Sequence, residues 1–256
     1  MDGLHALAAR RSTRIVTISE WCRGEIARAY RVSPAKISVT VCGPGNRLNR
    51  LPPDELARVD VSTVVPHGVR YIMTLSTLEP RKNLPGLLEA FARLRPEQPG
   101  LKLLVVGARG WQETPVFDAV GRQGLQDDVI FAGYVDDAMI GPLLQRAELV
   151  VVPSYVEGFG IPALEAMLVG APVACSNTSS LPEVVGEAAF GFPPEDPARM
   201  AEVLSAALSD PGARIAMGRA GAARAARFTW DASLRGIERA WIEAASGPTS
   251  GRQTVS

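Results

Sequence analysis

Short apolar runs alternate with amphipathic segments through the middle of the chain. Tyr71–Ser76 is apolar enough for a buried strand, and Asn83–Arg95 follows it with apolar residues at helical spacing and Asn83 as its predicted N-cap. Continuous apolar strands between amphipathic helices are typical of a parallel sheet covered on both faces. The sequence therefore predicts an α/β fold with a doubly wound parallel sheet. Further strands are predicted at Leu101–Gly107, Val129–Gly133, Glu148–Pro153 and Pro172–Ser176.

Several helix starts are marked by capping residues. Ser180 and Glu183 have the spacing of a capping box. Asp136 or Asp137 is expected to cap the helix after Gly133. The remaining predicted starts are Thr114-Pro115, Asp196-Pro197, Asp210-Pro211 and Thr229.

The first 70 residues follow a different pattern. Arg14–Ser19 and Ile37–Val41 predict two strands around a helix at Glu20–Tyr30, and Gly43-Pro44-Gly45 then breaks the pattern. One strand–helix–strand unit cannot bury itself, so we interpret residues 1–42 as the remnant of a second domain whose beginning is absent. Residues 43–70 are then a linker, 71–228 the sheet domain, 229–246 a final helix and 247–256 a polar tail expected to be disordered.

Composition excludes several classes of function. The 27 basic residues balance the 27 acidic ones, so no basic face for nucleic acid is indicated. Cys22, Cys42 and Cys175 are widely separated, as expected for reduced thiols in a cytosolic protein, and the two histidines form no metal motif. The sequence shows neither a signal peptide nor an apolar run long enough to span a membrane.

Ligands of doubly wound folds bind at the carboxyl ends of strands, which directs attention to the segment Pro153–Glu165. Gly158 and Gly160 allow close backbone approach to a ligand, and a helix N-terminus near Pro162 suits a phosphate. Glu157 and Glu165 can accept hydrogen bonds from sugar hydroxyls. The alternative is that both are solvated surface acids.

Three other strand exits carry candidate residues. Arg81 and Lys82 follow the first strand of the sheet domain and can neutralise a diphosphate, although a solvated basic pair is the alternative. Gly107–Trp111 follows another predicted strand, but by itself it is only weak evidence of a ligand site. The backbone at Ala132–Val135 can bond a nucleobase edge or simply end a strand.

Taken together, these motifs resemble the family-4 retaining glycosyltransferases, which have the GT-B fold. Seven residues separate Glu157 from Glu165, and Gly-Phe-Gly follows the first of them. The other matching motifs, within a resemblance from about Arg14 to Trp241, are Thr77–Asn83, Ser176–Val184 and Phe228-Thr229-Trp230. The resemblance implies a Rossmann-like, nucleotide-sugar-binding C-terminal domain, with a remnant of the acceptor-side N-terminal domain and a C-terminal crossover helix.

The resemblance also implies residue roles. It gives Arg81, Lys82 and Glu157 as catalytic, the two cations stabilising the diphosphate as it leaves. It implies no protein nucleophile, metal or cofactor, and the donor substrate is a GDP- or UDP-sugar. Glu157 would hold the sugar together with the backbone of Gly158, Phe159 and Gly160. Glu165 would hold the ribose hydroxyls, and Leu164 would pack near the ribose. Tyr134 and Val135 would flank the base.

Two departures from the family pattern stand out. Ser76 occupies a position where the family has glycine, and Cys42-Gly43-Pro44-Gly45 stands where it has a Pro-Asn-Gly or Pro-His-Gly turn. The absent N-terminal domain would supply the acceptor site, so no residue here is assigned to it.

The expected function is transfer of a hexose, with mannose suggested, to a glycan or lipid-linked acceptor. The alternative is a nucleotide-sugar-binding half-transferase, or a truncated inactive relative, that needs an N-terminal-domain partner or self-association. A dinucleotide oxidoreductase is disfavoured because no G-x-G-x-x-G follows a strand with an acid about twenty residues on. The expected location is the cytoplasm, with peripheral attachment to the inner membrane face as in relatives.

Overall fold

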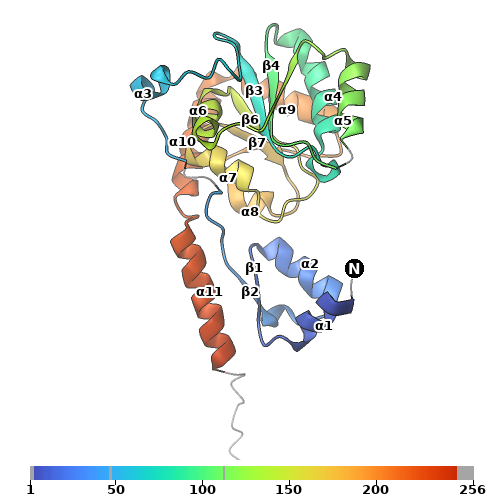
Figure 1. The fold of residues 1–256 in the computed structure, drawn as a ribbon, viewed down its shortest axis with the longest axis vertical. Coiled ribbons are helices and arrows are strands. Elements are labelled where there is room, and N and C mark those ends of the chain that lie inside the picture. Colours follow the sequence, from blue (N-terminus) through green and yellow to red (C-terminus); the bar gives the residue numbers. More distant parts are fainter. Residues whose placement is uncertain (1–2, 46–47, 112, 247–256) are drawn as a thin grey trace, which may run out of the picture. The chain divides into compact units, whose positions relative to one another are not determined.

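The computed structural model describes residues 3–45, 48–111 and 113–246 (Figure 1). The described residues form two compact units, one within residues 3–43 and 228–246 and the other within residues 44–227. The predicted tail at 247–256 lies outside the described residues. Residues 44–70, expected to be a linker, are grouped with the larger unit.

The larger unit contains a parallel sheet of six strands in the order β5-β4-β3-β6-β7-β8. The chain builds outward from β3 to β5 and then continues on the other side of β3, so the strand order reverses between β3 and β6. This confirms the predicted doubly wound α/β fold. The strands are β3 Tyr71–Leu75, β4 Lys102–Val106, β5 Val129–Gly133, β6 Leu149–Val152, β7 Val173–Ser176 and β8 Phe190–Phe192, of which β8 was not predicted.

Helices cover both faces of this sheet (Figure 1). On the face covered by α4, α5 and α9, strand residues such as Ile72 and Leu149 are fully buried and join Phe91 and Leu204 in one apolar core. Helices α6, α7 and α10 lie on the other face. The helices of the unit are α3 Pro53–Arg58, α4 Leu84–Leu94, α5 Thr114–Gln123, α6 Asp137–Arg146, α7 Ile161–Leu168, α8 Leu181–Val185, α9 Pro197–Ser209 and α10 Pro211–Ala225.

Most predicted caps are present. Asp136 caps α6 by accepting from the Ala138 N–H. Asp196 and Asp210 likewise accept backbone N–H bonds at the starts of α9 and α10.

Two predicted caps are wrong. Asn83 precedes α4 but has a φ of 53° and makes no side-chain cap bond; its amide instead donates to the Pro194 carbonyl at 2.8 Å. Ser180 has a helical rather than an extended backbone conformation, so its hydroxyl is not placed to cap α8 and donates to the carbonyl of Glu157. Both side chains therefore connect loops that are distant in sequence.

The smaller unit has a parallel pair of strands, β1 Ile15–Thr17 and β2 Ile37–Val39, joined by α2 Glu20–Tyr30. The last helix, α11 Trp230–Ala245, is capped by Thr229 as predicted. It packs small residues near β2, and a Cβ on Gly236 would lie 2.2 Å from Thr40 Oγ1. One helix of this unit, α1 Gly3–Arg11, was not predicted.

Candidate functional site

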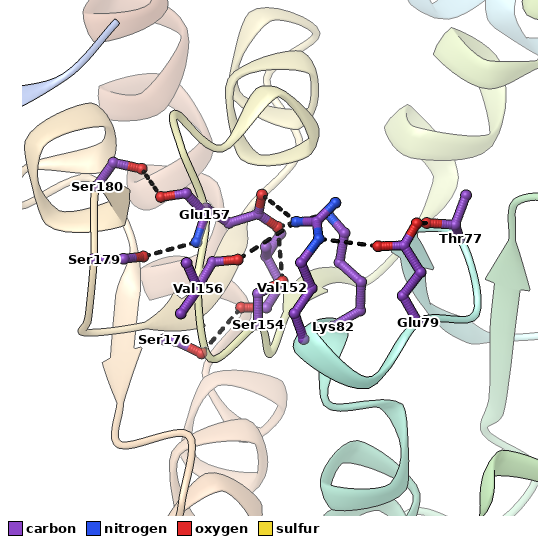
Figure 2. A network of polar contacts seen from close by, with 11 residues as sticks. Thr77, Glu79, Lys82, Val152, Ser154, Val156, Glu157, Ser176, Ser179 and Ser180 are labelled. Carbon is purple, nitrogen blue, oxygen red and sulfur yellow. Dashed lines mark hydrogen bonds and ion pairs between the residues drawn. The ribbon is translucent and has the colours of Figure 1, made fainter. Parts of the chain in front are cut away.

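The loops that follow β3 and β6 bring two cations and one carboxylate together (Figure 2). Lys82 and Arg81 lie in a 3-10 turn after β3, and Glu157 lies in the loop after β6. Lys82 Nζ is 2.7 Å from Glu157 Oε1, and an Arg81 terminal nitrogen is 3.3 Å from Glu157 Oε2. These residues therefore meet at the point where the strand order reverses, which is the ligand site expected for such sheets.

Lys82 and Glu157 are shielded from water. Their side chains are 9% and 7% exposed, whereas the Arg81 side chain is 46% exposed. A buried charge is tolerated only when it is paired and hydrogen-bonded. Lys82 and Glu157 are thus fixed members of the site, while Arg81 presents its guanidinium partly to solvent.

Arg81 is oriented by its own loop. Its Nε donates to Glu79 Oε2 at 2.9 Å, and the Thr77 hydroxyl donates to the other oxygen of Glu79 at 2.8 Å. The hydrogen bond from Thr77 lowers the pKa of Glu79, with the charges of Arg81 and Lys82 acting in the same direction. Glu79 therefore stays ionised at neutral pH and aligns Arg81.

Three serines that the sequence interpretation missed hold Glu157 in place (Figure 2). The Ser154 hydroxyl donates to Glu157 Oε1 at 2.7 Å. The Glu157 N–H donates to Ser179 Oγ at 3.0 Å, and the Ser180 hydroxyl donates to the Glu157 carbonyl at 2.8 Å. Their positions in the sequence were the available signal, because Ser154 lies just beyond the end of β6 and Ser179 and Ser180 lie in the segment after β7.

The turn between Glu157 and Glu165 has the expected close packing. Gly160 has a φ of 100°, and a Cβ there would lie 2.7 Å from the Leu181 side chain. Phe159 is buried, no side chain caps α7 at Gly160, and the N–H groups of Ala163 and Leu164 donate to the Gly160 carbonyl.

The second glutamate lies inside the protein. Glu165 in α7 is only 3% exposed, and a Cβ on Gly45 would lie 3.0 Å from its Oε1. Gly45, the last residue of the motif that departs from the family turn, therefore places its backbone against this carboxylate. Leu164, expected near the ribose, is fully buried.

The predicted base-flanking residues lie at another strand exit. Tyr134 is 80% exposed and Val135 is buried, and both line a pocket of about 490 Å³ after β5. Strand β5 is two strands away from β3. The Gly107 N–H donates to the Gly133 carbonyl, which ties the exit of β4 to that of β5.

Ser76, at the end of β3, has a polar atom without a partner. Its Oγ is buried and forms no hydrogen bond with any residue that the structure describes. Its carbonyl faces Gly107, where a Cβ would lie 2.1 Å from it.

The described residues contain neither a metal site nor a membrane span. No three His, Cys, Asp or Glu side chains gather closely enough there to hold a metal ion. Within the same residues, no helix combines the length and the apolar character that crossing a membrane requires.

Comparison with solved structures identifies the fold. Anabaena Alr3699/HepE in complex with UDP and glucose superposes with a TM-score of 0.81 at 22% identity, over 92% of this chain and 65% of that one. Sucrose-phosphate synthase from Thermosynechococcus elongatus gives a TM-score of 0.77 at 24% identity, over 95% of this chain and 61% of that one. The fold is therefore that of the GT-B glycosyltransferases.

Sequence comparison gives curated relatives as well as a family. O-antigen chain mannosyltransferase B of Escherichia coli is 36% identical over 85% of this chain and 57% of its own length. D-inositol 3-phosphate glycosyltransferase of Segniliparus rotundus is 30% identical over 92% of this chain and 53% of its own. The chain thus spans about half the length of these relatives. The family model described as glycosyl transferases group 1 matches residues 59–224, and the chain belongs to that family.

Proposed function

We propose that this chain carries the donor site of a retaining glycosyltransferase, which moves a hexose from a nucleotide-diphosphate sugar to a glycan or lipid-linked acceptor. The observation that carries the proposal is the meeting of Arg81 and Lys82 with the buried carboxylate of Glu157 at the β3–β6 switch point. Glu165, buried eight residues further on, supplies a second acceptor.

The proposed chemistry depends on charge that develops on the leaving group. Cleavage of the bond between sugar and phosphate leaves negative charge on the diphosphate, and preorganised cations stabilise that charge where it appears. Lys82 uses one of its three N–H donors on Glu157, so its other donors remain for a phosphate oxygen. Arg81, half-exposed and aligned by Glu79, is suited to a second phosphate contact.

We assign the other roles as proposals too. Glu157 with the backbone of Gly158, Phe159 and Gly160 holds the sugar, and Glu165 holds the ribose hydroxyls. Tyr134 and Val135 flank the base, and Leu164 supports the ribose site from the core. No nucleophile, metal or cofactor is assigned to the reaction.

The names of relatives favour mannose. Besides the protein of Escherichia coli, MMP alpha-(1->4)-mannosyltransferase of Mycolicibacterium hassiacum is 31% identical over 87% of this chain. The solved complex of Anabaena Alr3699/HepE contains UDP, so both bases belong in the test.

Calorimetric titration with UDP, GDP and NAD tests the donor site. Glu165→Ala removes a carboxylate that would bond two ribose hydroxyls and is expected to weaken nucleotide binding about 5- to 150-fold. Glu187→Ala, at an exposed position in the same unit, is the matched control and should bind like the unsubstituted chain. A folded chain that binds neither nucleotide would overturn the proposal, and binding of NAD instead would favour an oxidoreductase.

A second candidate is a half-transferase that works only with a partner N-terminal domain. The smaller unit favours it, because Leu4, Leu7 and Val16 are exposed at 74%, 50% and 38%. Exposed apolar surface of this kind marks an interaction site. An assay with radiolabelled GDP-mannose separates the two candidates when this chain is compared with one that carries an N-terminal domain. The half-transferase predicts turnover only by the longer chain.

A further inference from the structure

A pocket rich in arginine lies at the amino ends of β6 and β7, opposite the ends that carry Glu157. Glu148 directly precedes β6, and Pro172 directly precedes β7. The pocket has a volume of about 400 Å³. We call it the arginine pocket, defined by Arg50, Arg146, Arg214 and Arg219 with Glu148 and Gly170.

The charges of the arginine pocket do not balance. Glu148 is the one acid among the residues that line it, against four arginines. That acid is already engaged, because Arg70 donates to both of its oxygens, at 2.6 and 3.0 Å, and Arg214 lies 3.8 Å away. The lining therefore keeps a net positive charge of about three, which attracts an anion.

Two of the arginines have no partner among the residues that the structure describes. Neither Arg50 nor Arg219 forms a hydrogen bond or an ion pair with any residue in the described part of the chain. Arg50 is nevertheless held in place. Its guanidinium lies over Gly170, where a Cβ would be 3.1 Å from Arg50 Cζ, and Gln145 makes two hydrogen bonds to the backbone of the adjacent Leu51.

The other two arginines are positioned by neutral groups. Arg146 donates to the carbonyls of Leu56 and Val59 at 2.6 and 2.7 Å. Arg214 donates to the carbonyls of Ala207 and Leu208 at the end of α9. Carbonyl oxygens orient a guanidinium without cancelling its charge. Four cations are therefore gathered around a single carboxylate, that of Glu148, which Arg70 already binds.

We propose that the arginine pocket binds a phosphate group, carried either by a lipid headgroup or by a soluble phosphate. The planar guanidinium matches phosphate oxygens in a bidentate geometry, and several arginines around one cavity are the usual chemistry of phosphate recognition. Exposed Ile215 also lines the pocket, an arrangement that suits contact with a membrane surface. The site is separate from the donor site, so the proposal stands independently of the proposed function.

Phosphate titration of the full chain, followed by NMR of its arginine Nε–H groups, tests the site. The Arg50 and Arg219 signals are expected to shift saturably with inorganic phosphate. In the double variant Arg50→Ala/Arg219→Ala, the Arg146 and Arg214 signals report on phosphate binding. Their apparent phosphate affinity should fall at least tenfold, because two charge-assisted contacts are lost. Arg93→Ala/Arg122→Ala removes the same charge from exposed positions on α4 and α5 and should leave the response unchanged. Arg81 is followed in the same spectra, so phosphate at the donor site is distinguished.

Vesicle flotation separates the two sources of phosphate. Binding to phosphatidylglycerol vesicles but not to phosphatidylcholine vesicles, lost in Arg50→Ala/Arg219→Ala alone, would identify a lipid headgroup. A phosphate response without vesicle binding would identify a soluble ligand. The proposal is overturned if neither phosphate nor vesicles shift the pocket arginines, or if the two double variants respond alike.

Discussion

The Lys82 ammonium group lies 2.7 Å from Glu157 Oε1, although Glu157 is 75 positions further along the chain, and both residues are buried. Removal of one partner leaves the other charge buried with less compensation, which is strongly destabilising. We therefore expect Lys82→Met and Glu157→Gln each to lower the free energy of unfolding by about 3 kcal/mol. Urea unfolding followed by circular dichroism measures both changes.

The double variant is the sharper test of the same contact. Because Lys82→Met with Glu157→Gln leaves no unpaired charge at this position, its loss should be well below the sum of the single losses. Strict additivity would show that the two charges do not interact. Arg93→Met and Glu89→Gln, an exposed pair on α4, should each cost at most about 1 kcal/mol.

The Ser180 hydroxyl offers a test of how the Glu157 loop is held. Ser180→Ala leaves the Glu157 carbonyl without this donor, and we expect a loss of about 1–3 kcal/mol in unfolding free energy. Nucleotide binding should also weaken, since the loop loses its anchor. Thr229→Ala removes a genuine helix cap in the smaller unit, so it should cost about 1 kcal/mol and leave nucleotide affinity unchanged. Equal nucleotide affinities in the two variants would contradict the anchoring role.

The sequence predicts the sheet of this chain well, because its central strands are apolar runs that only a doubly covered sheet buries. It also locates Arg81, Lys82 and Glu157 at strand exits, which lie at one edge of a parallel sheet. It misses β8, because Phe190–Phe192 is three residues long and has glycine at its centre, which leaves no periodicity to detect.

The side-chain partners of the site are harder to predict. Ser180 and Asn83 stand where local rules expect a cap, yet each bonds to a carbonyl brought near by the tertiary fold. Ser154 has no pattern that separates it from any other serine after a strand. Local sequence rules consider nearby acceptors only, whereas Ser180 and Asn83 reach carbonyls on separate loops. Ser154 bonds within its own loop, to a glutamate whose position the tertiary fold sets.

Asp128 predicts a pH-dependent contribution to stability. Hydrogen bonds from Lys102 first, and also from Arg95, hold its pKa below the ordinary value of 3.8. A carboxyl with a lowered native pKa stabilises the fold above its unfolded-state pKa, and that contribution disappears as the pH falls through the native pKa. Asp128→Asn should therefore cost about 1 kcal/mol at pH 7 and progressively less below pH 3.8. Urea midpoints across this range measure the difference, and a cost independent of pH would contradict it.

The three cysteines should differ in reactivity. Burial raises the pKa of Cys175 to about 12, and its side chain is only 2% exposed, whereas Cys22 and Cys42 are half-buried. Because the thiolate is the reactive form, Cys175 should resist iodoacetamide at pH 8 in the folded chain and react once the chain is unfolded. Peptide mass spectrometry after timed labelling reads out each site. Rapid labelling of Cys175 in the folded chain would contradict its burial in strand β7.

Gly107 and Gly124 form a matched pair for testing the close contact between the exits of β3 and β4. Both have positive φ, at 145° and 62°, but a Cβ on Gly107 would lie 2.1 Å from the Ser76 carbonyl oxygen, while a Cβ on Gly124 would meet nothing within 4 Å. Gly124→Ala should cost about 1–2 kcal/mol from backbone strain alone. Gly107→Ala adds overpacking against a backbone atom that cannot rotate away, so we expect a loss of about 2–5 kcal/mol in unfolding free energy.

The Gly107→Ala substitution should also displace Ser76 and the adjacent Arg81 loop, and weaken nucleotide binding, whereas Gly124→Ala leaves nucleotide affinity intact. Thermal unfolding and nucleotide calorimetry on both variants check this, and equal losses would mean that strain, not the Ser76 contact, governs Gly107.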